Sequence, residues 1–555
     1  MSIYNKKTLI GILLLTIMIS FIFYIATKED KYNKDELYEN KIADHNQDPS
    51  DKNYGVASNN PIATRVGEKI LKDGGNAVDA SMGVSYALAI TEPHSSGLGG
   101  GGAMLAYDGQ ENVAPKQWQY KDISSFDYDK KDEIGTPGFV RGIHDAHEEA
   151  GKMDEKKILN YVIPLAEEGF EVDSELERSL KLYGSDVDRD SPFFEGDQTK
   201  REGEVIKQPE LAETIKGIRD HGPDYFYDKV GESVADQVDE EVTEKDFKSY
   251  KTTKKEPVST DYLNTKVYSA SNPLGGTLML QGLEIDEAIN NQVPQISHDT
   301  QAATNNGVAQ DTQAGAEPTT NNRLDYITGI LKSRALMYRN RDIVNGQDEA
   351  YDEYLSQDYL LGKLNEVNFN SNFNTNNVDN TSTTHFVVVD KEGKVTSTTN
   401  TLSSFFGSGD FMKEGFYMNN SLDNFSSDPT SPNYGGKHKT PRSYTAPSIV
   451  VGPDFYMGIG TPGGNKIPTT TNEVLIDYLK GNGTLQESID KPRFYNDGGK
   501  IFYENATSKE DIKIFKSLGF EIEEKRNDPN FGSIQAALYN KNDKTVEIGN
   551  DVGNR

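Results

Sequence analysis

Apolar residues recur at helical spacing near the start of the main body of the chain. Ile62, Val66 and Ile70 stand four residues apart, and a Gly-Gly pair follows them at residues 74–75. This spacing predicts an amphipathic helix that ends at the glycine pair. Residues 77–91 are apolar almost throughout, and they predict a second helix that is buried in the core.

Runs of β-branched and apolar residues predict several strands. The most evident pattern is a hairpin, in which HFVVVD and KVTSTTNTL flank a Lys-Glu-Gly turn at residues 391–393. A strand, a turn at Asn272-Pro273 and a helix are predicted over residues 267–289. Further strands are predicted at residues 103–108, 448–451 and 456–460, and helical signals with turns occupy residues 154–219. Strands interleaved with helices in this way indicate an α/β chain.

The first residues have the pattern of a membrane segment. Lys6 and Lys7 precede the apolar run LIGILLLTIMISFIFYIA, which is long enough for a helix to cross a bilayer. No small-x-small cleavage site follows, so we expect residues 1–27 to be an uncleaved anchor and residues 28–53 a stalk. The two lysines favour an inner N-terminus, which places the body outside the cell membrane, at the cell surface. A cleaved signal peptide is the alternative.

Two polar stretches interrupt the body. Residues 295–322 contain small and polar residues without periodicity, which predicts a disordered surface insertion. Residues 368–381 are rich in asparagine and form a second loose stretch directly before the hairpin.

Composition excludes several classes of function. The chain has 555 residues, with 58 Lys+Arg against 88 Asp+Glu, a formal charge of −30. An acidic chain is not expected to bind nucleic acid, which requires a basic footprint. The absence of cysteine excludes disulfides, iron–sulfur clusters, thiolate zinc sites and a cysteine nucleophile. We expect neither a metal nor an organic cofactor.

Two motifs suggest chemistry that their context does not support. Residues 97–102 match G-x-G-x-x-G, but the predicted helix precedes the glycines and the strand follows, the reverse of a dinucleotide site. Close backbone packing that only glycine permits is the expected reason for them. His144 and His147 could hold a metal, although the flanking Glu148 and Glu149 favour a solvated helix face. Neither a G-x-S-x-G elbow nor a P-loop occurs in the sequence.

A hydroxyl-rich segment begins where the second polar stretch ends. Residues 381–386 read TSTTHF and open the first strand of the hairpin. This arrangement suits a self-cleaving nucleophile, whose hydroxyl attacks the preceding carbonyl and whose freed α-amine then serves as a base. β-Propensity alone would also place threonines at the start of a strand.

Eight segments in order resemble the γ-glutamyltransferase family of N-terminal nucleophile hydrolases. They are ASNNPIA (57–63), GGNAVDA (74–80), EPHSSGLGGGG (92–102), GTPGFV (135–140), TTHF (383–386), NTLSSFFGSG (400–409), NNSLDNF (419–425) and TPGGNKIP (461–468). The resemblance implies an α+β fold with four αββα layers. It also implies self-cleavage between Ser382 and Thr383, giving a large chain (54–382) and a small chain (383–555) that stay associated.

The resemblance also implies roles for single residues. Thr383 would be the nucleophile and its α-amine the base, Thr401 would hydrogen-bond that amine, and Ser403 would contact substrate. The backbone N–H groups of Gly463 and Gly464 would form the oxyanion hole. Water or an amine would then resolve the γ-glutamyl-enzyme, giving hydrolysis or transpeptidation.

Departures from the family pattern concern the substrate. Asn424 stands where ordinary members have the aspartate that binds a free α-ammonium group, and Ser421 replaces their glutamine. In poly-γ-glutamate the internal α-amines are acylated and the α-carboxylates exposed, so the change resembles the branch of the family that acts on the capsular polymer. The short segment 425–447 would leave a groove open to a polymer. Attachment of the polymer to the cell wall and depolymerisation are both compatible with the sequence.

Several further residues are expected at the substrate site. Lys121 stands where the family has a carboxylate-binding arginine, and it keeps the charge without the bidentate fork. The other candidates are Arg442, which could replace that arginine, Ser443, Tyr444 and the final residue Arg555. For Lys121 and Arg442 a surface charge pair is the alternative. Because the chain is acidic, a polyanionic substrate requires a locally basic pocket.

Two other functions fit the same sequence. An ordinary γ-glutamyltransferase or glutathione hydrolase would use the same nucleophile on a small substrate. A surface protein that kept the fold as a non-catalytic binding module would not cleave itself.

Overall fold

The computed structural model describes residues 53–292, 320–367 and 381–551, apart from residues 240, 340, 342–345, 347–350, 365, 498, 527 and 529–530. The expected anchor, nearly all of the stalk and insertion, and Arg555 lie outside the described residues. Helix α12 (Thr320–Arg339) takes in the last three residues of the predicted insertion. Thr381, at the junction of the asparagine-rich stretch and the TSTTHF segment, belongs to strand β11 (Thr381–Val389).

Two antiparallel sheets of six strands form the centre of the described chain. The first has the order β1 (Gly55–Ser58), β11, β12 (Val395–Ser404), β2 (Gly101–Tyr107), β3 (Lys116–Gln119), β8 (Thr253–Lys254). The second has the order β21 (Val546–Asn550), β20 (Gln535–Asn540), β16 (Phe455–Gly460), β15 (Ser448–Val451), β10 (Thr265–Ser269), β9 (Val258–Tyr262). The predicted hairpin is β11–β12 and is confirmed.

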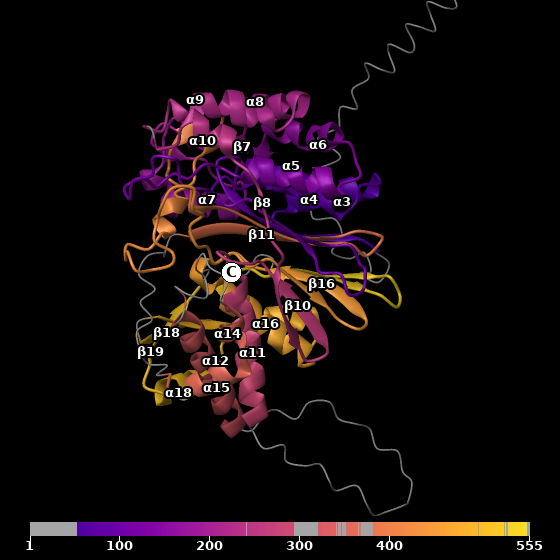
Figure 1. The fold of residues 1–555 in the computed structure, drawn as a ribbon, viewed down its shortest axis with the longest axis vertical. Helices are drawn as coiled ribbons and strands as arrows, with labels where there is room; N and C mark the ends of the chain where they lie inside the picture. Colours follow the sequence, from indigo (N-terminus) through magenta and orange to yellow (C-terminus); the bar gives the residue numbers. More distant parts are fainter. Residues whose placement is uncertain are drawn as a thin grey trace, which may run out of the picture. The chain divides into compact units, whose positions relative to one another are not determined.

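Helices cover the outer face of each sheet, so the layers run helix, sheet, sheet, helix (Figure 1). Against the first sheet lie α3 (Pro61–Lys72), α4 (Ala77–Thr91) and α5 (Phe139–Ala150), and α6 (Glu155–Glu167) packs on α4. Against the second lie α11 (Gly276–Gln292), α16 (Ile467–Leu479) and α17 (Leu485–Asp490). Strands β20 and β16 pack directly on β11 and β12. The predicted αββα fold is therefore confirmed.

The remaining elements surround these layers. The helices are α7 (Ser174–Tyr183), α8 (Pro209–His221), α9 (Gly231–Ala235), α10 (Glu244–Ser249), α14 (Tyr351–Leu355), α15 (Gln357–Leu364) and α18 (Lys509–Ser517). A three-stranded sheet contains β17 (Phe494–Asp497), β18 (Lys500–Glu504) and β19 (Glu521–Lys525). Short two-stranded sheets are formed by β4 (Phe170–Glu171) with β7 (Val205–Ile206), β5 (Phe194–Glu195) with β6 (Gln198–Thr199), and β13 (Phe411–Met412) with β14 (Phe416–Tyr417).

The first two helices begin at asparagine caps. The Asn60 side chain accepts hydrogen bonds from the first turn of α3, and Asn76 forms a capping box with Asp79 at the start of α4. In α3 the buried face contains Val66 and Ile70. Every residue of α4 is buried, as the apolar sequence predicts.

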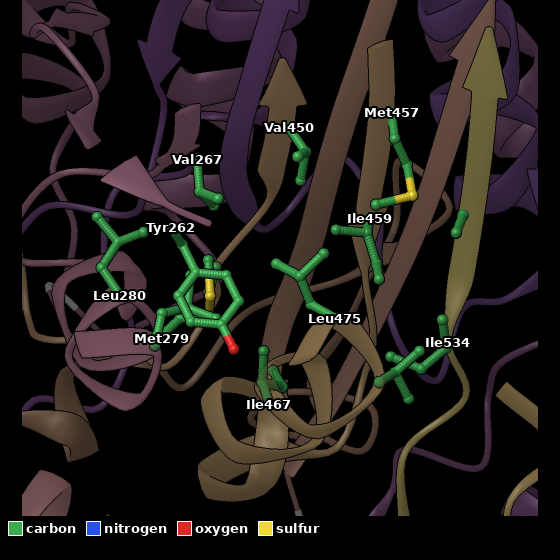
Figure 2. Packing of buried hydrophobic residues seen from close by; sticks show 14 of the residues in the cluster. Tyr262, Val267, Met279, Leu280, Val450, Met457, Ile459, Ile467, Leu475 and Ile534 are labelled. Atoms are coloured by element: carbon green, nitrogen blue, oxygen red, sulfur yellow. The ribbon is translucent and has the colours of Figure 1, made fainter. Parts of the chain in front are cut away.

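Apolar side chains fill both interfaces of the second sheet. Between the sheets, a cluster includes Leu105, Val387, Val395 and Ile449, all fully buried. On the outer face, Val267, Val450 and Ile459 from strands β10, β15 and β16 belong to one apolar cluster with Met279 of α11 and Leu475 of α16 (Figure 2). Full burial of such a side chain stabilises the fold by roughly 1.5–3 kcal/mol. This packing holds β11 and β12 in place, and with them the residues at their ends.

The histidine pair of α5 does not lie on a solvated face, and that expectation is wrong. His144 is 3% exposed and His147 8%. The His144 ring lies 2.8 Å from the hydroxyl of Tyr86 and 2.9 Å from Glu155, and His147 Nε2 lies 3.1 Å from Asp79. Helix α4 packs against α5, and Glu155 is the first residue of α6, so neighbouring helices cover this face. The two rings therefore connect helices.

The helices in the described part of the chain are too short or too polar to cross a bilayer. The predicted anchor lies outside that part, so its placement stays a prediction.

Candidate active site

Thr383 lies at an irregularity near the start of β11. Ser382 pairs with Ser403 and Thr384 pairs with Asn400, so Thr383 faces two residues of β12, Thr401 and Leu402. Two residues against one is the pattern of a β-bulge, which interrupts regular pairing and re-aims side chains. Thr383 is 7% exposed. The bulge therefore gives this threonine a setting that regular strand pairing would not provide.

The hydroxyl of Thr401 connects the residues around the proposed cleavage point. It donates to the carbonyl oxygen of Ser382 at 2.7 Å and accepts from the backbone N–H of Ser403 at 2.8 Å. The hydroxyl of Thr383 donates to the hydroxyl oxygen of Thr401 over a longer distance, 3.4 Å. One donated and two accepted contacts use the full capacity of a hydroxyl. Thr401 thus polarises the carbonyl that precedes Thr383.

The backbone supports this arrangement through an uncommon conformation. Ser403 has φ of +85°, the left-handed region that residues other than glycine rarely adopt. Such a conformation costs about 1–3 kcal/mol unless its surroundings enforce it, and it is frequent at functional sites. Here it turns the Ser403 N–H back to Thr401.

A turn after α4 contacts the residue that precedes Thr383, and its side chains were not among the residues expected from the sequence. The Oγ of Ser95 lies 2.6 Å from the Oγ of Ser382. Glu92 belongs to the same turn, and the neighbouring side chains of Thr384 and Asn60 oppose the effect of burial on the pKa of its carboxyl group. Burial raises the pKa of Glu92 to about 8, so the group is largely protonated at neutral pH. Both residues belong to the EPHSSGLGGGG segment, which could have drawn attention to them.

The glycine run that follows this turn has the structural role predicted for it. A Cβ on Gly100 would lie 2.4 Å from the carbonyl oxygen of Thr401, and one on Gly102 would lie 2.2 Å from that of Thr399. Gly99 and Gly101 are equally close to other backbone atoms. Glycine therefore allows β2 and its approach to pack against β12 beside the bulge.

Gly463 and Gly464 lie in a tight turn that leads into α16. Their φ angles are +129° and +56°, both in the region that glycine tolerates. The short helical turn Gly464–Lys466 packs against β11. The N-terminus of α16, where backbone dipoles favour negative charge, follows at once. This location is consistent with the oxyanion-hole role expected for the pair, which stays a prediction.

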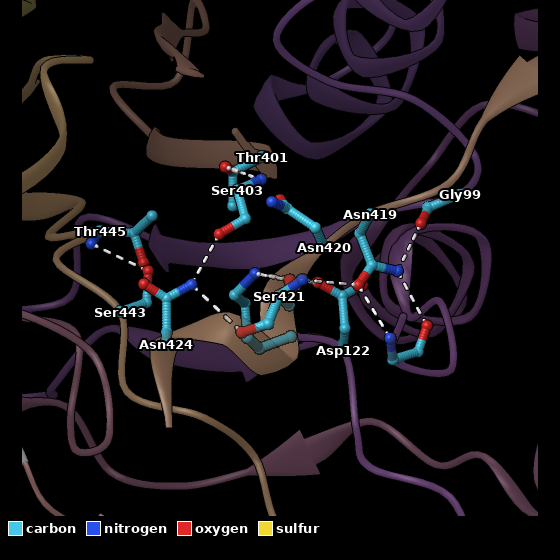
Figure 3. A network of polar contacts seen from close by, with 12 residues as sticks. Gly99, Asp122, Thr401, Ser403, Asn419, Asn420, Ser421, Asn424, Ser443 and Thr445 are labelled. Atoms are coloured by element: carbon cyan, nitrogen blue, oxygen red, sulfur yellow. Dashed lines mark hydrogen bonds and ion pairs between the residues drawn. The ribbon is translucent and has the colours of Figure 1, made fainter. Parts of the chain in front are cut away.

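Hydrogen bonds connect the segment around the NNSLDNF motif to the glycine run and to Ser403 (Figure 3). The Asn419 amide nitrogen donates to the carbonyl oxygens of Gly99 and Gly135, at 2.7 and 2.8 Å. The Asn424 amide nitrogen donates to Ser403 Oγ at 2.6 Å and to the carbonyl oxygen of Ser421 at 3.1 Å. Because the backbone N–H of Ser403 also donates to the Thr401 hydroxyl, Ser403 connects Asn424 to Thr401.

Lys121 is buried in an ion pair. Its ammonium lies 2.8 Å from Asp122 Oδ2 and 2.7 Å from Ser421 Oγ, and Ser421 also donates to Asp122. The side chains of Lys121 and Asp122 are 2% and 0% exposed, so the surface alternative for Lys121 is wrong. Burial raises the pKa of Asp122, and Lys121 and Ser421 oppose this effect. The charge of Lys121 is largely balanced within the protein.

The other candidates for substrate binding lie at different depths. Arg442 is partly exposed, and its backbone N–H donates to Asn433 Oδ1 at 3.0 Å. Asn433 in turn donates to the carbonyl oxygen of Asn424 at 2.8 Å, which links Arg442 to the site. Ser443 is partly exposed, whereas Tyr444 is 6% exposed and belongs to the core on the outer face of the second sheet.

Comparison with known proteins gives a consistent result. Residues 63–552 match the family model described as gamma-glutamyltranspeptidase. The chain is similar to the capsule biosynthesis protein CapD proenzyme of Bacillus anthracis, with 31% identity over 506 residues, 90% of this chain and 89% of that protein. It is 28% identical to a glutathione hydrolase proenzyme of Bacillus subtilis over 84% of this chain and 85% of the relative. Cephalosporin acylase from Bacillus halodurans shares the fold, with a TM-score of 0.73 at 18% identity, over 89% of this chain and 96% of that chain.

Proposed function

The protein belongs to the gamma-glutamyltranspeptidase family and is an enzyme of γ-glutamyl transfer or hydrolysis, and we propose that it activates itself by cleavage at Ser382–Thr383 and then acts on capsular poly-γ-glutamate. The observation that carries the proposal is the hydrogen bond from Thr401 to the Ser382 carbonyl oxygen beside the Thr383 hydroxyl. The names of two relatives, both proenzymes, are consistent with it.

In the proposed self-cleavage, the Thr383 hydroxyl oxygen attacks the carbonyl carbon of Ser382. The C–N bond between the two residues breaks, and the hydroxyl proton ends on the departing nitrogen, which leaves an ester between them. Water then hydrolyses the ester to give a carboxyl group on Ser382 and a free hydroxyl and α-amine on Thr383. Thr401 stabilises the charge that develops on the carbonyl oxygen.

The same hydroxyl would act in turnover. With the α-amine of Thr383 as base, its oxygen attacks a γ-glutamyl carbonyl, and the leaving amine takes up a proton. The N–H groups of Gly463 and Gly464 are expected to bind the oxyanion. Water or an amine acceptor then releases the γ-glutamyl group and regenerates Thr383.

Asn424 supports a polymer as the substrate. Its amide nitrogen is engaged by Ser403 and Ser421, and an amide offers no negative charge to a free α-ammonium group. Glutathione carries such a group, whereas the internal residues of poly-γ-glutamate do not. The preference for the polymer therefore follows from a missing charge at one position.

Arg442 is the cation that we expect to contact the polymer's α-carboxylates. Lys121 is already balanced by Asp122, and a guanidinium group binds a carboxylate through two parallel hydrogen bonds. Replacement of Arg442 by alanine is expected to raise the KM for the polymer about tenfold or more, with a smaller effect on kcat. Lys437→Ala removes one positive charge from an exposed position of the same segment and is the matched control. An unchanged KM for the Arg442 variant would remove this residue from the site.

We further propose that the two chains stay associated after cleavage. The part of β11 from Thr383 onward would belong to the small chain. Strand β11 lies between β1 of the large chain and β12, and α4 packs on it, so cleavage would not separate the layers. Residues 1–27 would anchor the enzyme in the membrane and place the body at the cell surface. Hydrolysis would release the polymer, and transfer to a cell-wall amine would attach it.

The first experiment tests self-cleavage. Wild-type protein without residues 1–27 and its Thr383→Ala variant are compared on a denaturing gel, and the smaller band is sequenced from its N-terminus. Two bands in the wild type, one in the variant and the sequence TTHFV are the expected result. A single uncut band in both would overturn the proposal and favour the non-catalytic binding module.

The second experiment tests the substrate. We expect the enzyme to turn over poly-γ-glutamate with a much higher kcat/KM than glutathione. Asn424→Asp restores a negative charge and is expected to improve kcat/KM for glutathione about tenfold, whereas Ser427→Asp adds the same charge at an exposed position and should not. Comparable activity of the wild type on both substrates would favour an ordinary glutathione hydrolase.

A further inference from the structure

The turn after α4 contacts the residue that precedes the proposed cleavage point. The Oγ of Ser95 lies 2.6 Å from the Oγ of Ser382. Side chains that flank a nucleophile determine where its hydroxyl and the preceding carbonyl point.

The turn is itself fixed at several points. The N–H groups of Ser95 and Ser96 donate to the carbonyl oxygen of Glu92 at 2.9 and 3.1 Å, which ties the turn to the end of α4. The N–H of Leu402, in the bulge of β12, donates to the carbonyl oxygen of Ser95 at 3.1 Å. These bonds connect the end of α4 to the bulge of β12 through Ser95.

We propose that Ser95 is a positioning residue for self-cleavage, which holds Ser382 so that the Thr383 hydroxyl faces the Ser382 carbonyl. The proposal rests on the proposed cleavage at Ser382–Thr383. Ser95 exchanges no bond in the reaction. Because the bond breaks once, the contact between Ser95 and Ser382 serves activation of the enzyme rather than each turnover.

The test follows the rate of self-cleavage of the full chain, made by cell-free translation and sampled over time on denaturing gels. Ser95→Ala is expected to slow cleavage about tenfold, the effect of one lost hydrogen bond in a buried site. Ser96→Ala is the matched control, because Ser96 is buried beside Ser95 and its hydroxyl has no hydrogen-bond partner among the described residues. It should cleave at the wild-type rate.

A second variant removes the other hydroxyl of the same contact. Ser382→Ala should slow cleavage about as much as Ser95→Ala, and the double variant should be no slower than either single one, because both remove one interaction.

The outcomes are distinct. Thermal unfolding of each variant, measured in the uncleaved Thr383→Ala background, reports stability separately from the cleavage rate. Positioning is supported if Ser95→Ala cleaves slowly but unfolds at the same midpoint temperature as Ser96→Ala. Wild-type rates for Ser95→Ala and Ser382→Ala, or a double variant whose loss is the product of the two single losses, would overturn the inference. A wild-type chain that stays uncut would overturn the proposed function instead.

Discussion

The Oγ1 of Thr401 lies 2.7 Å from the carbonyl oxygen of Ser382, although the two residues are separated by 19 positions in the chain. The β-bulge in β12 makes this contact possible, because it places two residues opposite Thr383. A hydroxyl in this position can bind the carbonyl oxygen before and during attack.

Removal of the Thr401 hydroxyl should therefore impair self-cleavage. Thr401→Val keeps the shape of the side chain but loses the donor, and we expect the rate to fall roughly 100-fold, as when an oxyanion donor is removed. Thr401→Ser keeps the donor and should stay within about tenfold of the wild type. Gel-based time courses of the precursor measure both rates. Equal rates for the valine and serine variants would contradict the role of the hydroxyl.

The glycine run should respond to alanine position by position. At Gly100 a Cβ would lie 2.4 Å from the backbone oxygen of Thr401, so Gly100→Ala must displace β12 and is expected to lower the unfolding midpoint and slow cleavage. At Gly97 no atom lies within 4 Å of the added Cβ, so Gly97→Ala is the control and should be tolerated. Thermal unfolding and the cleavage assay distinguish the two. Equal tolerance at both positions would refute close packing as the reason for Gly100.

The buried pair of Lys121 and Asp122 should be sensitive to removal of one partner. Lys121→Met leaves the Asp122 carboxylate buried without its cation, and the expected loss in the free energy of unfolding is about 3–5 kcal/mol. The double variant Lys121→Met/Asp122→Asn removes both charges and should recover part of that loss. Urea denaturation in the uncleaved Thr383→Ala background measures these differences.

An exposed pair provides the control for that comparison. Lys248 and Glu244 form an ion pair on the surface of α10, and Lys248→Met should change stability little. If the double variant at Lys121 and Asp122 were as unstable as Lys121→Met alone, the unpaired charge would not be the cause.

The pKa of Glu92 predicts a pH dependence of stability. Burial is the largest cause of its rise to about 8, and repulsion from Asp173 and Glu175 adds to it. The folded state holds the proton more tightly than the unfolded state, so this contribution to stability is full below about pH 4.5 and is lost as the pH rises through about 8. Glu92→Gln does not titrate, so its unfolding midpoint relative to the parent should rise between about pH 5 and pH 8 and level off above that.

Thermal unfolding at several pH values, again in the Thr383→Ala background, tests this expectation. A difference for Glu92→Gln that stays constant with pH would mean that the Glu92 carboxyl group is not perturbed by folding.

The local pattern of apolar and β-branched residues was sufficient to predict most of the helices and strands. The helix at residues 77–91 and the strand at 448–451 have the predicted bounds, because apolar periodicity and β-branched runs are properties of the nearest neighbours in the chain. The surroundings of His144 and His147 were predicted wrongly, because the sequence of α5 does not indicate which helices will cover it.

The sequence by itself determined the kind of elements, the family and the threonine at which cleavage is proposed, since these depend on short motifs read in order. The tertiary structure alone decided which distant side chains meet at that threonine. Ser95 lies 287 positions from its partner Ser382, and Lys121 lies 300 positions from Ser421. Such pairs arise from the register of β11 and β12 and from the packing of α4 on their sheet, which the sum of many non-local contacts determines.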